Sequence, residues 1–156
     1  MKTELILVGK TNDKHFQTGI DDYCQRIGHY MPFSITVIPE LKNTKSLSFQ
    51  QQKEREGELI LAKLQSSDHV VLLDEHGKDF RSVEFARWIE QKNASVRRLV
   101  FVIGGPYGFS EAVYSRANEK ISLSKITFSH QMVRLVFVEQ IYRACTIIKG
   151  EPYHHE

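Results

Sequence analysis

The chain has 156 residues, of which 41% are hydrophobic and 26% are charged, with 9 Gly and 4 Pro. This composition excludes a collagen, a low-complexity polymer and a wholly disordered chain, and the length predicts a single domain, residues 1–156. The net charge is +2, and residues 97–156 carry eight Lys and Arg against five acids, a mild basic bias that does not by itself indicate nucleic-acid binding.

Hydrophobic periodicity alternates between short strands and longer helices, which predicts an α/β fold with a mostly parallel sheet. The predicted strands are residues 4–8, 34–39, 69–74, 99–103 and, more weakly, 120–123. The predicted helices are residues 13–28, 46–65, 82–93, 110–118 and 130–149. Because residues 70–73 and 99–103 are continuously apolar, we expect helices on both faces of the sheet.

Local signals mark several boundaries of these elements. Ser82 and Ser110 are predicted N-caps, and Gly28 and Gly150 stand where helices should end. Residues 42–48 are predicted to form a mobile loop before a charged, solvated helix, with a functional lid as the alternative.

The last predicted helix differs from the others because its apolar residues lie on more than one face. In a domain this small, a partner subunit is the simplest cover for the additional face. The sequence therefore predicts an oligomer whose contact includes residues 130–149.

A glycine-rich turn follows the apolar strand 99–103, in the sequence F-V-I-G-G-P-Y-G-F. Glycines there permit positive φ and leave room for a ligand at the carboxyl end of the sheet, where open α/β folds bind ligands. A tight turn without a ligand is the alternative. The spacing matches neither a dinucleotide fingerprint nor a phosphate loop. Leu73 and Asp74 end another strand, where Asp74 would bind a ribose hydroxyl or simply form a turn.

Residues 121–134 alternate small hydroxyl and apolar side chains. Backbone groups of such a loop can form hydrogen bonds with a flat heterocycle, while apolar side chains form the walls of the binding pocket. Ser129 or Thr127 is expected to cap the last helix. His130 is expected just inside that helix, as a surface residue or as a base beside the pocket.

The ending G-E-P-Y-H-H-E is unusual, because tails are generally frayed and polar. Adjacent histidines are compatible with a tag remnant or a weak metal site, but neither explains Pro152 and Tyr153, which stiffen the chain and offer a stacking surface.

Other classes of protein are disfavoured by what the sequence lacks. No apolar run approaches the roughly 20 residues of a membrane span, and no apolar stretch near Met1 is long enough for a signal peptide, so we expect a cytoplasmic protein. Cys24 and Cys145 lie far apart without further ligands at metal spacing. Neither a disulfide framework nor a metal site is predicted.

Several segments, in order and at matching spacing over the whole chain, resemble the RlmH family, small bacterial methyltransferases of the SPOUT class. They are L-I-L-V-G-K, Y-x-x-R-I, E-x-E-G, F-V-I-G-G-P-Y-G-F, L-S-K-I-T-F-S-H-Q-M-V-R, V-E-Q-I-Y-R-A and G-E-P-Y-H-H. The resemblance implies methylation of N3 of a pseudouridine in 23S ribosomal RNA, with S-adenosyl-L-methionine as cofactor and a homodimer as the active form. It also implies a SPOUT-type trefoil knot in the C-terminal part, which no periodicity would predict.

The resemblance carries site residues over to matching positions. Those for the cofactor are Leu73, Gly104, Leu123, Ser124, Lys125, Ile126, Thr127 and Phe128. The tail of one subunit is expected over the cofactor of the other, which makes Tyr153, His154, His130 and Arg143 the catalytic candidates. In this interpretation His154 is the proton acceptor or anion partner, Tyr153 a base-stacking platform and Arg143 a phosphate or anion contact. One member of the family carries Arg where this chain has His155, so a phosphate contact at this position is not carried over.

Two competing functions remain open. One is a noncatalytic RNA- or ribosome-binding protein that keeps a ligand-binding fold, and S-adenosylmethionine binding would discriminate against it. The other is a SPOUT enzyme for transfer RNA or another ribosomal position, which nucleoside mapping would detect. Because no RNA-binding domain is attached and the basic bias is mild, the expected substrate is an assembled ribosomal particle or large subunit rather than naked RNA.

Overall fold

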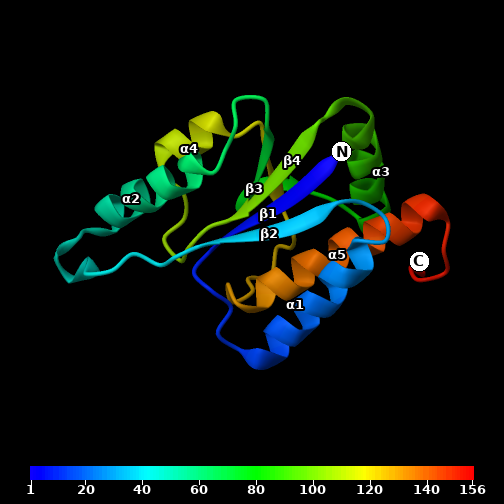
Figure 1. Cartoon of the computed structure of the whole chain (residues 1–156), viewed down its shortest axis with the longest axis horizontal. Helices are drawn as coiled ribbons and strands as arrows, with labels where there is room; N and C mark the ends of the chain where they lie inside the picture. Colours follow the sequence, from blue (N-terminus) through cyan, green and yellow to red (C-terminus); the bar gives the residue numbers. More distant parts are fainter.

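The computed structural model describes residues 1–156 and contains one five-stranded sheet in which every strand pair is parallel (Figure 1). The strand order is β2-β1-β4-β3-β5. The strands are β1 Lys2–Val8, β2 Phe33–Ile38, β3 His69–Asp79, β4 Arg98–Ile103 and β5 Glu119–Ser122. The predicted parallel α/β fold is confirmed, and only the end of β3 extends well beyond its predicted bounds.

Helices cover both faces of the sheet, as predicted (Figure 1). They are α1 Lys14–Ile27, α2 Phe49–Ala62, α3 Ser82–Ser95, α4 Glu111–Arg116 and α5 Met132–Lys149, with a 3₁₀ turn at Thr44–Ser46. The steps from β1 to β2 and from β3 to β4 run in one direction across the sheet and use α1 and α3 on one face. The steps from β2 to β3 and from β4 to β5 run the opposite way and use α2 and α4 on the other face, so all four crossovers have the same hand, as the chirality rule for parallel strands requires. None of the helices combines the length and apolarity that a membrane crossing needs.

Alternate residues of each central strand enter two separate cores. On one face, strand residues pack against α1, α3 and α5, and the strand contribution is Leu5, Leu7, Val71, Leu99, Phe101, Ile103 and Ile121. On the other face they pack against α2 and α4, and the strand contribution is Ile6, Val8, Ile38, Val70, Leu72, Val100 and Val102. The continuously apolar strands are therefore explained by burial on both sides.

The long helix α5 lies between α1 and α3 (Figure 1). Its buried apolar residues all belong to the core on that face, and they are Phe137, Val138, Ile141, Ala144 and Cys145. Two neighbouring helices and the sheet thus cover most of the apolar surface of α5, while Met132 and Ile148 each remain 36% exposed. The apolar character of α5 therefore does not by itself require a partner subunit, and the dimer is argued from other features.

Three of the predicted end signals act as expected, and one does not. Ser110 caps α4, Gly28 is the C-cap of α1, and Gly150, with φ of 70°, ends α5. Ser82 does not cap α3, because the helix already begins at Ser82 and Arg81 precedes it. The Ser82 hydroxyl instead donates to Gln140 Oε1 at 2.9 Å and ties α3 to α5.

Strand β3 is interrupted near its carboxyl end. Ile121 of β5 pairs with Leu73 and again with Lys78, so residues 74–77 of β3 bulge out of the pairing with β5. A Cβ atom on Gly77 would lie 2.5–2.7 Å from the backbone of Ile121, closer than any side chain allows. Position 77 must therefore be glycine for β3 to pair with β5 again. The unpaired residues 74–76 project outward at this end of the sheet.

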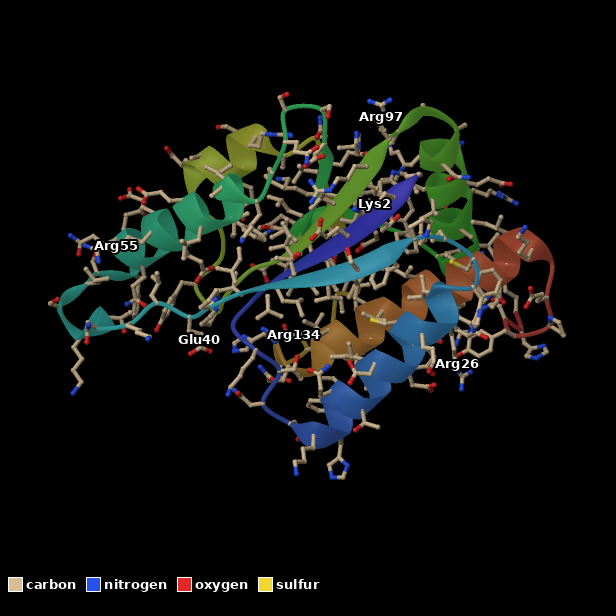
Figure 2. All side chains as sticks on the ribbon, viewed as in Figure 1. Lys2, Arg26, Glu40, Arg55, Arg97 and Arg134 are labelled. Carbon is tan, nitrogen blue, oxygen red and sulfur yellow. The ribbon has the colours of Figure 1, made fainter.

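The buried Arg134 fastens the first turn of α5 to the loop that follows β1 (Figure 2). Its guanidinium donates to the Val8 carbonyl at 2.7 Å and to Thr11 Oγ1 at 3.1 Å. Close by, the Asn12 backbone N–H donates to Gln131 Oε1 at 2.8 Å. These contacts fix the point at which the loop between β5 and α5 enters the last helix.

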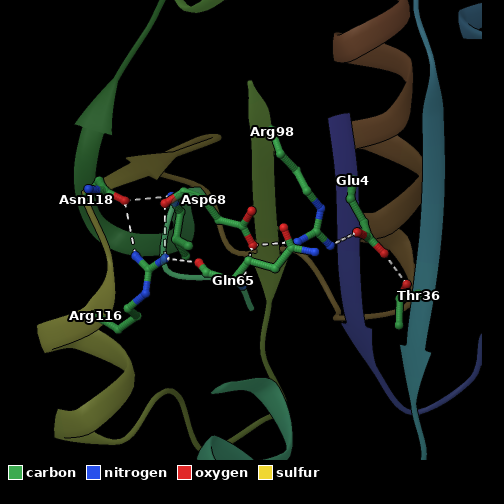
Figure 3. A network of polar contacts seen from close by, with 8 residues as sticks. Glu4, Thr36, Gln65, Asp68, Arg98, Arg116 and Asn118 are labelled. Carbon is green, nitrogen blue, oxygen red and sulfur yellow. Dashed lines mark hydrogen bonds and ion pairs between the residues drawn. The ribbon is translucent and has the colours of Figure 1, made fainter. Parts of the chain in front are cut away.

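A buried ion network crosses the sheet toward the amino ends of its strands (Figure 3). Arg98 of β4 pairs with Glu4 of β1 and with Asp68, which precedes β3, and Thr36 of β2 donates to Glu4. Burial alone would raise the pKa of Glu4, but the hydrogen bonds from Thr36 and Arg98 and the charge of Arg98 bring it below its usual value.

Candidate functional site

A cleft of about 850 Å³ opens at the carboxyl ends of β3, β4 and β5. Three segments form most of it, with further contributions from Tyr114, His130 and Val133: residues 73–76 in the carboxyl-terminal part of β3, residues 103–109 from the end of β4 onward, and residues 122–128 from the end of β5 onward. Because β3 lies between β4 and β5, the three segments come from adjacent strands. This is the edge where parallel α/β sheets bind ligands.

The cleft brings together all eight residues that the sequence analysis assigned to the cofactor. Leu73, Gly104 and every residue of the 123–128 segment line it, and so does His130. His130 is exposed and lies in the turn before α5, which begins at Met132. The expectation that it lies inside the helix was therefore wrong.

The backbone conformation of the glycine turn differs from the expectation. Gly104 and Gly105 do not have positive φ, and only Gly108 does, with φ of 83°. A Cβ atom on Gly104 would lie 2.8 Å from the ring of Phe109, which is buried in the core next to α2 and α4. The small size of Gly104 therefore accommodates Phe109, in addition to leaving the backbone open toward the cleft.

Glu56 of α2 supports this turn from behind. Its carboxylate accepts a hydrogen bond from the Gly105 backbone N–H at 3.0 Å, and a Cβ atom on Gly105 would meet the carboxylate at 2.8 Å. Burial raises the pKa of Glu56, and the hydrogen bond from Gly105 opposes that change. Glu56 is the second glutamate of the E-x-E-G motif, for which no role was predicted. That motif was the signal that could have identified this residue.

Asp74 forms the turn after β3. One of its oxygens accepts from the His76 backbone N–H at 2.8 Å, and the other accepts from the Tyr114 hydroxyl. Burial and this hydrogen bond raise the pKa of Tyr114 to about 12. Both carboxylate oxygens thus have partners within the chain, which favours the turn interpretation over a ribose contact.

The loop after β5 offers an open apolar wall. Ser124 shapes it, because its carbonyl accepts from the Ser122 hydroxyl at 3.2 Å and its Oγ accepts from the Ile126 N–H at 3.0 Å. Ser129 Oγ accepts from the Met132 N–H at 3.1 Å and so binds the first residue of α5, although the N-cap position itself is Gln131 and not Ser129 or Thr127. Ile126 is 75% exposed although it lines the cleft. Such exposure suits a wall that a ligand or a second chain covers.

The C-terminal tail is packed against α5 and α1. The Tyr153 hydroxyl donates to Glu139 Oε1 at 2.9 Å and lies 3.5 Å from the Tyr23 hydroxyl. The Arg143 guanidinium covers the Tyr153 ring, 4.8 Å from its centroid. Burial and the hydrogen bonds with Tyr23 and Glu139 raise the pKa of Tyr153. The tail is therefore held in place by contacts with α1 and α5. The Arg143 guanidinium already covers one face of the Tyr153 ring, which was expected to stack on a base.

Arg143 also determines which nitrogen of the His154 ring carries the hydrogen. It forms an ion pair with Glu139, Nη2 to Oε1 at 2.6 Å, and its Nη1 lies 3.0 Å from His154 Nδ1. Since a guanidinium has donors only, Nδ1 must accept and the hydrogen of the neutral ring must be on Nε2. Nε2 is buried without a hydrogen-bond partner, 3.8 Å from the Glu156 carboxylate.

The structure does not bring this tail cluster to the cleft of the same chain. Arg143 is 11 residues into α5 from Met132, which is roughly 16 Å along the helix axis. The cleft and His130 lie before the first turn of that helix, whereas Tyr153 and His154 contact its second half. Of the four catalytic candidates, Arg143, Tyr153 and His154 form one cluster and His130 belongs to the other site. Glu139 is the member of this cluster that sequence reasoning missed.

Comparison with known proteins agrees with the resemblance seen in the sequence. The family model described as "Predicted SPOUT methyltransferase" matches residues 1–154. Proteins named ribosomal RNA large subunit methyltransferase H are 66% identical in Bacteroides fragilis, 61% identical in Parabacteroides distasonis and 57% identical in Flavobacterium johnsoniae, each alignment covering the whole of both chains. The chain therefore belongs to the SPOUT methyltransferases, in the family of the ribosomal RNA large subunit methyltransferases H.

Proposed function

We propose that this protein transfers the methyl group of S-adenosylmethionine to N3 of a pseudouridine in 23S ribosomal RNA. The observation that carries the proposal is the cleft at the carboxyl ends of β3, β4 and β5, in a chain of this family. An RNA substrate of this kind would place the reaction in the cytoplasm, where ribosomes are made.

The residues of the cleft fit the proposed cofactor. Leu73, Leu123 and Ile126 offer apolar surface for an adenine ring and a methionine chain, and the backbone groups of the glycine turn and of the 123–128 segment offer hydrogen bonds. The volume of about 850 Å³ is within the range of small-molecule sites. When bound, S-adenosylmethionine supplies a methyl group on a positively charged sulfur. The task of the chain is to line up the acceptor nitrogen with that carbon.

The tail supplies groups that suit the nucleophile. The imide N3–H of a pseudouridine is a weak acid whose proton passes to solvent water, and the negative charge that develops is shared between N3 and its two flanking carbonyl oxygens. A donor aimed at a carbonyl oxygen therefore accelerates transfer while the N3 lone pair stays free to attack the methyl carbon. In the arrangement that Arg143 imposes, His154 presents Nε2–H, which is such a donor. We therefore assign His154 the role of anion partner rather than proton acceptor. The Glu156 carboxylate stands on that side of the ring, so it must move when the substrate binds.

A homodimer would unite the two sites. Within one chain, the tail cluster and the cleft lie at different parts of α5. The open wall at Ile126 is available for the tail of a second copy. We propose that the active form is a homodimer in which each cleft is completed by the partner's Tyr153 and by the partner's His154.

The proposal is tested by incubating the protein with labelled S-adenosylmethionine and ribosomes that lack the modification, followed by nucleoside mapping. We expect label on N3 of a single pseudouridine of the large-subunit RNA. Cofactor binding without transfer would favour a ribosome-binding protein, and label at another nucleoside would favour a SPOUT enzyme of different specificity. A chain truncated after Gly150 serves as the control, because it keeps every cleft residue and should bind the cofactor without transferring the methyl group.

A further inference from the structure

Two large aromatic side chains stack on each other at the surface of the molecule. The rings of Phe49 and Tyr107 have centroids 4.3 Å apart and an interplanar angle of 19°. Phe49 is 63% exposed and Tyr107 is 44% exposed. An exposed pair of rings is costly in water, and such surfaces generally serve recognition.

This pair lies at the rim of the cleft. Tyr107 belongs to the glycine turn that lines it, and Phe49 is the first residue of α2. The helix is anchored to the chain on both sides of Tyr107. Glu56 accepts from the Gly105 N–H at 3.0 Å, and Gly57 approaches Ser110 so closely that a Cβ atom there would lie 2.4 Å from its hydroxyl. The two rings are therefore held in a fixed position relative to the cleft.

The charge around the pair suits a polyanion. Residues 41–53 contain three basic residues, Lys42, Lys45 and Lys53, and no acid. Lys42 and Lys45 are exposed on the segment that leads into α2. The other neighbours of Phe49 in sequence are polar, with three glutamines following it.

We propose that the Phe49–Tyr107 pair is a stacking platform for an unpaired base of the RNA substrate that flanks the nucleotide bound in the cleft. Exposed aromatic faces beside lysines are the general means of binding single-stranded nucleic acid, because every base has a face to stack and every phosphate a charge. This inference rests on the proposed function for its substrate class. It adds an RNA contact at the rim of the cofactor cleft, separate from the tail.

The test compares Phe49→Leu, which keeps an apolar side chain but removes the ring, with Phe49→Trp, which keeps a ring. Leu59→Ala is the matched control, because Leu59 is a 40% exposed apolar residue on the same helix. The affinity for undermodified ribosomes is measured by binding, and KM and kcat for methyl transfer are measured separately. We expect Phe49→Leu to weaken ribosome binding and raise KM by roughly 5- to 150-fold, with kcat and cofactor binding unchanged. Phe49→Trp and Leu59→Ala should behave as the wild type.

The salt dependence of binding gives a second measurement. Lys45→Ala should reduce the slope of log affinity against log salt by about 1 if this lysine contacts a phosphate, and Phe49→Leu should leave the slope unchanged. Unchanged ribosome affinity in Phe49→Leu would overturn the platform. So would a change of oligomeric state in sedimentation, since it would make the pair a protein contact. Absence of methyl transfer by the wild type would overturn the proposed function instead, and the binding comparison would still decide on the platform.

Discussion

At the scale of single residues, the hydrogen bond from Arg143 to His154 restricts what the imidazole can do. With Nδ1 accepting at 3.0 Å, the free nitrogen carries the hydrogen and can donate to a negative charge. Glu139 holds Arg143 in place and also accepts from the Tyr153 hydroxyl. These residues position His154, and only His154 is expected to contact the reacting imide, at a carbonyl oxygen that shares its negative charge.

Substitutions of His154 distinguish a donor from a base. We expect His154→Ala to lower kcat by about 10²-fold or more, as the loss of one preorganised donor does. His154→Gln keeps an N–H near the position of Nε2 and cannot accept a proton, so it should retain activity to within about tenfold of the wild type. Steady-state methyl transfer with both variants makes the comparison. A Gln variant as inactive as the Ala variant would return His154 to the role of proton acceptor.

Glu56 permits a second prediction at this scale. Glu56→Ala should weaken S-adenosylmethionine binding about tenfold, because the hydrogen bond to Gly105 N–H holds the glycine turn, and a bond to a charged group is worth about 1.5 kcal/mol or more. Glu56→Gln keeps an acceptor and should bind nearly as the wild type does. Titration calorimetry measures both. Equal losses in the two variants would mean that the charge matters, and not the hydrogen bond.

At the scale of elements, β1, β2, β4 and the start of β3 are joined by the network around Arg98 (Figure 3). The pKa of Glu4 is lowered in the folded state. A carboxyl group with a lowered pKa stabilises the fold fully above its unfolded-state pKa, and the contribution is lost as the pH falls through the folded-state pKa. The network should therefore stabilise the sheet at neutral pH and fail in acid.

Replacing Arg98 by a neutral residue tests the pH dependence of the stability that this network contributes. Arg98→Met should reduce the free energy of unfolding by about 3–5 kcal/mol at pH 7, because Glu4 and Asp68 are left buried without a cationic partner. The deficit should shrink as the pH falls into the acid range, because Glu4 can then take up a proton and no longer requires a cation. Urea denaturation at pH 7 and in the acid range tests this. Arg55→Met, at an exposed position of α2, is the control and should change little.

At the scale of the whole molecule, the cleft and the tail cluster are separate sites of one chain. The proposed dimer predicts that two defective chains can complement each other. Ile126→Glu is a suitable cleft variant, because the residue is 75% exposed and the fold should tolerate the change. Gly104→Val is unsuitable, because its side chain would strike Phe109 in the core.

Mixing Ile126→Glu chains with chains truncated after Gly150 should restore methyl transfer, although each homodimer is inactive. The expected rate is about a quarter of the wild-type rate, since random pairing makes half of the dimers mixed and each mixed dimer has one complete site. Activity of the separate and mixed preparations, with sedimentation to show that mixed dimers form, makes the test. Mixed dimers without activity would contradict the composite site.

Much of this architecture follows from local patterns in the sequence. The continuous apolar runs of β3 and β4 predicted a sheet buried on both faces, and the glycine turn, the β3 end and the 123–128 segment pointed to one cleft. The excursion in β3 was not predictable, because the need for Gly77 arises only where Ile121 approaches it. Likewise, the apolar residues of α5 indicated burial without indicating that α1 and α3 bury them. The knot is implied by membership of the SPOUT family and by no local pattern.

The strand order also has a consequence for biosynthesis. Strand β1 leaves the ribosome early and finds β2, but its other neighbour, β4, begins only at Arg98, and β3 must wait for the same strand. The nascent chain therefore carries an unpaired apolar strand edge through most of its translation, a state that invites wrong pairing with other chains. Completion of the sheet depends on contacts between residues distant in sequence, which slows folding. Newly made chains should thus depend on chaperones more than a sheet of the same size built from consecutive hairpins.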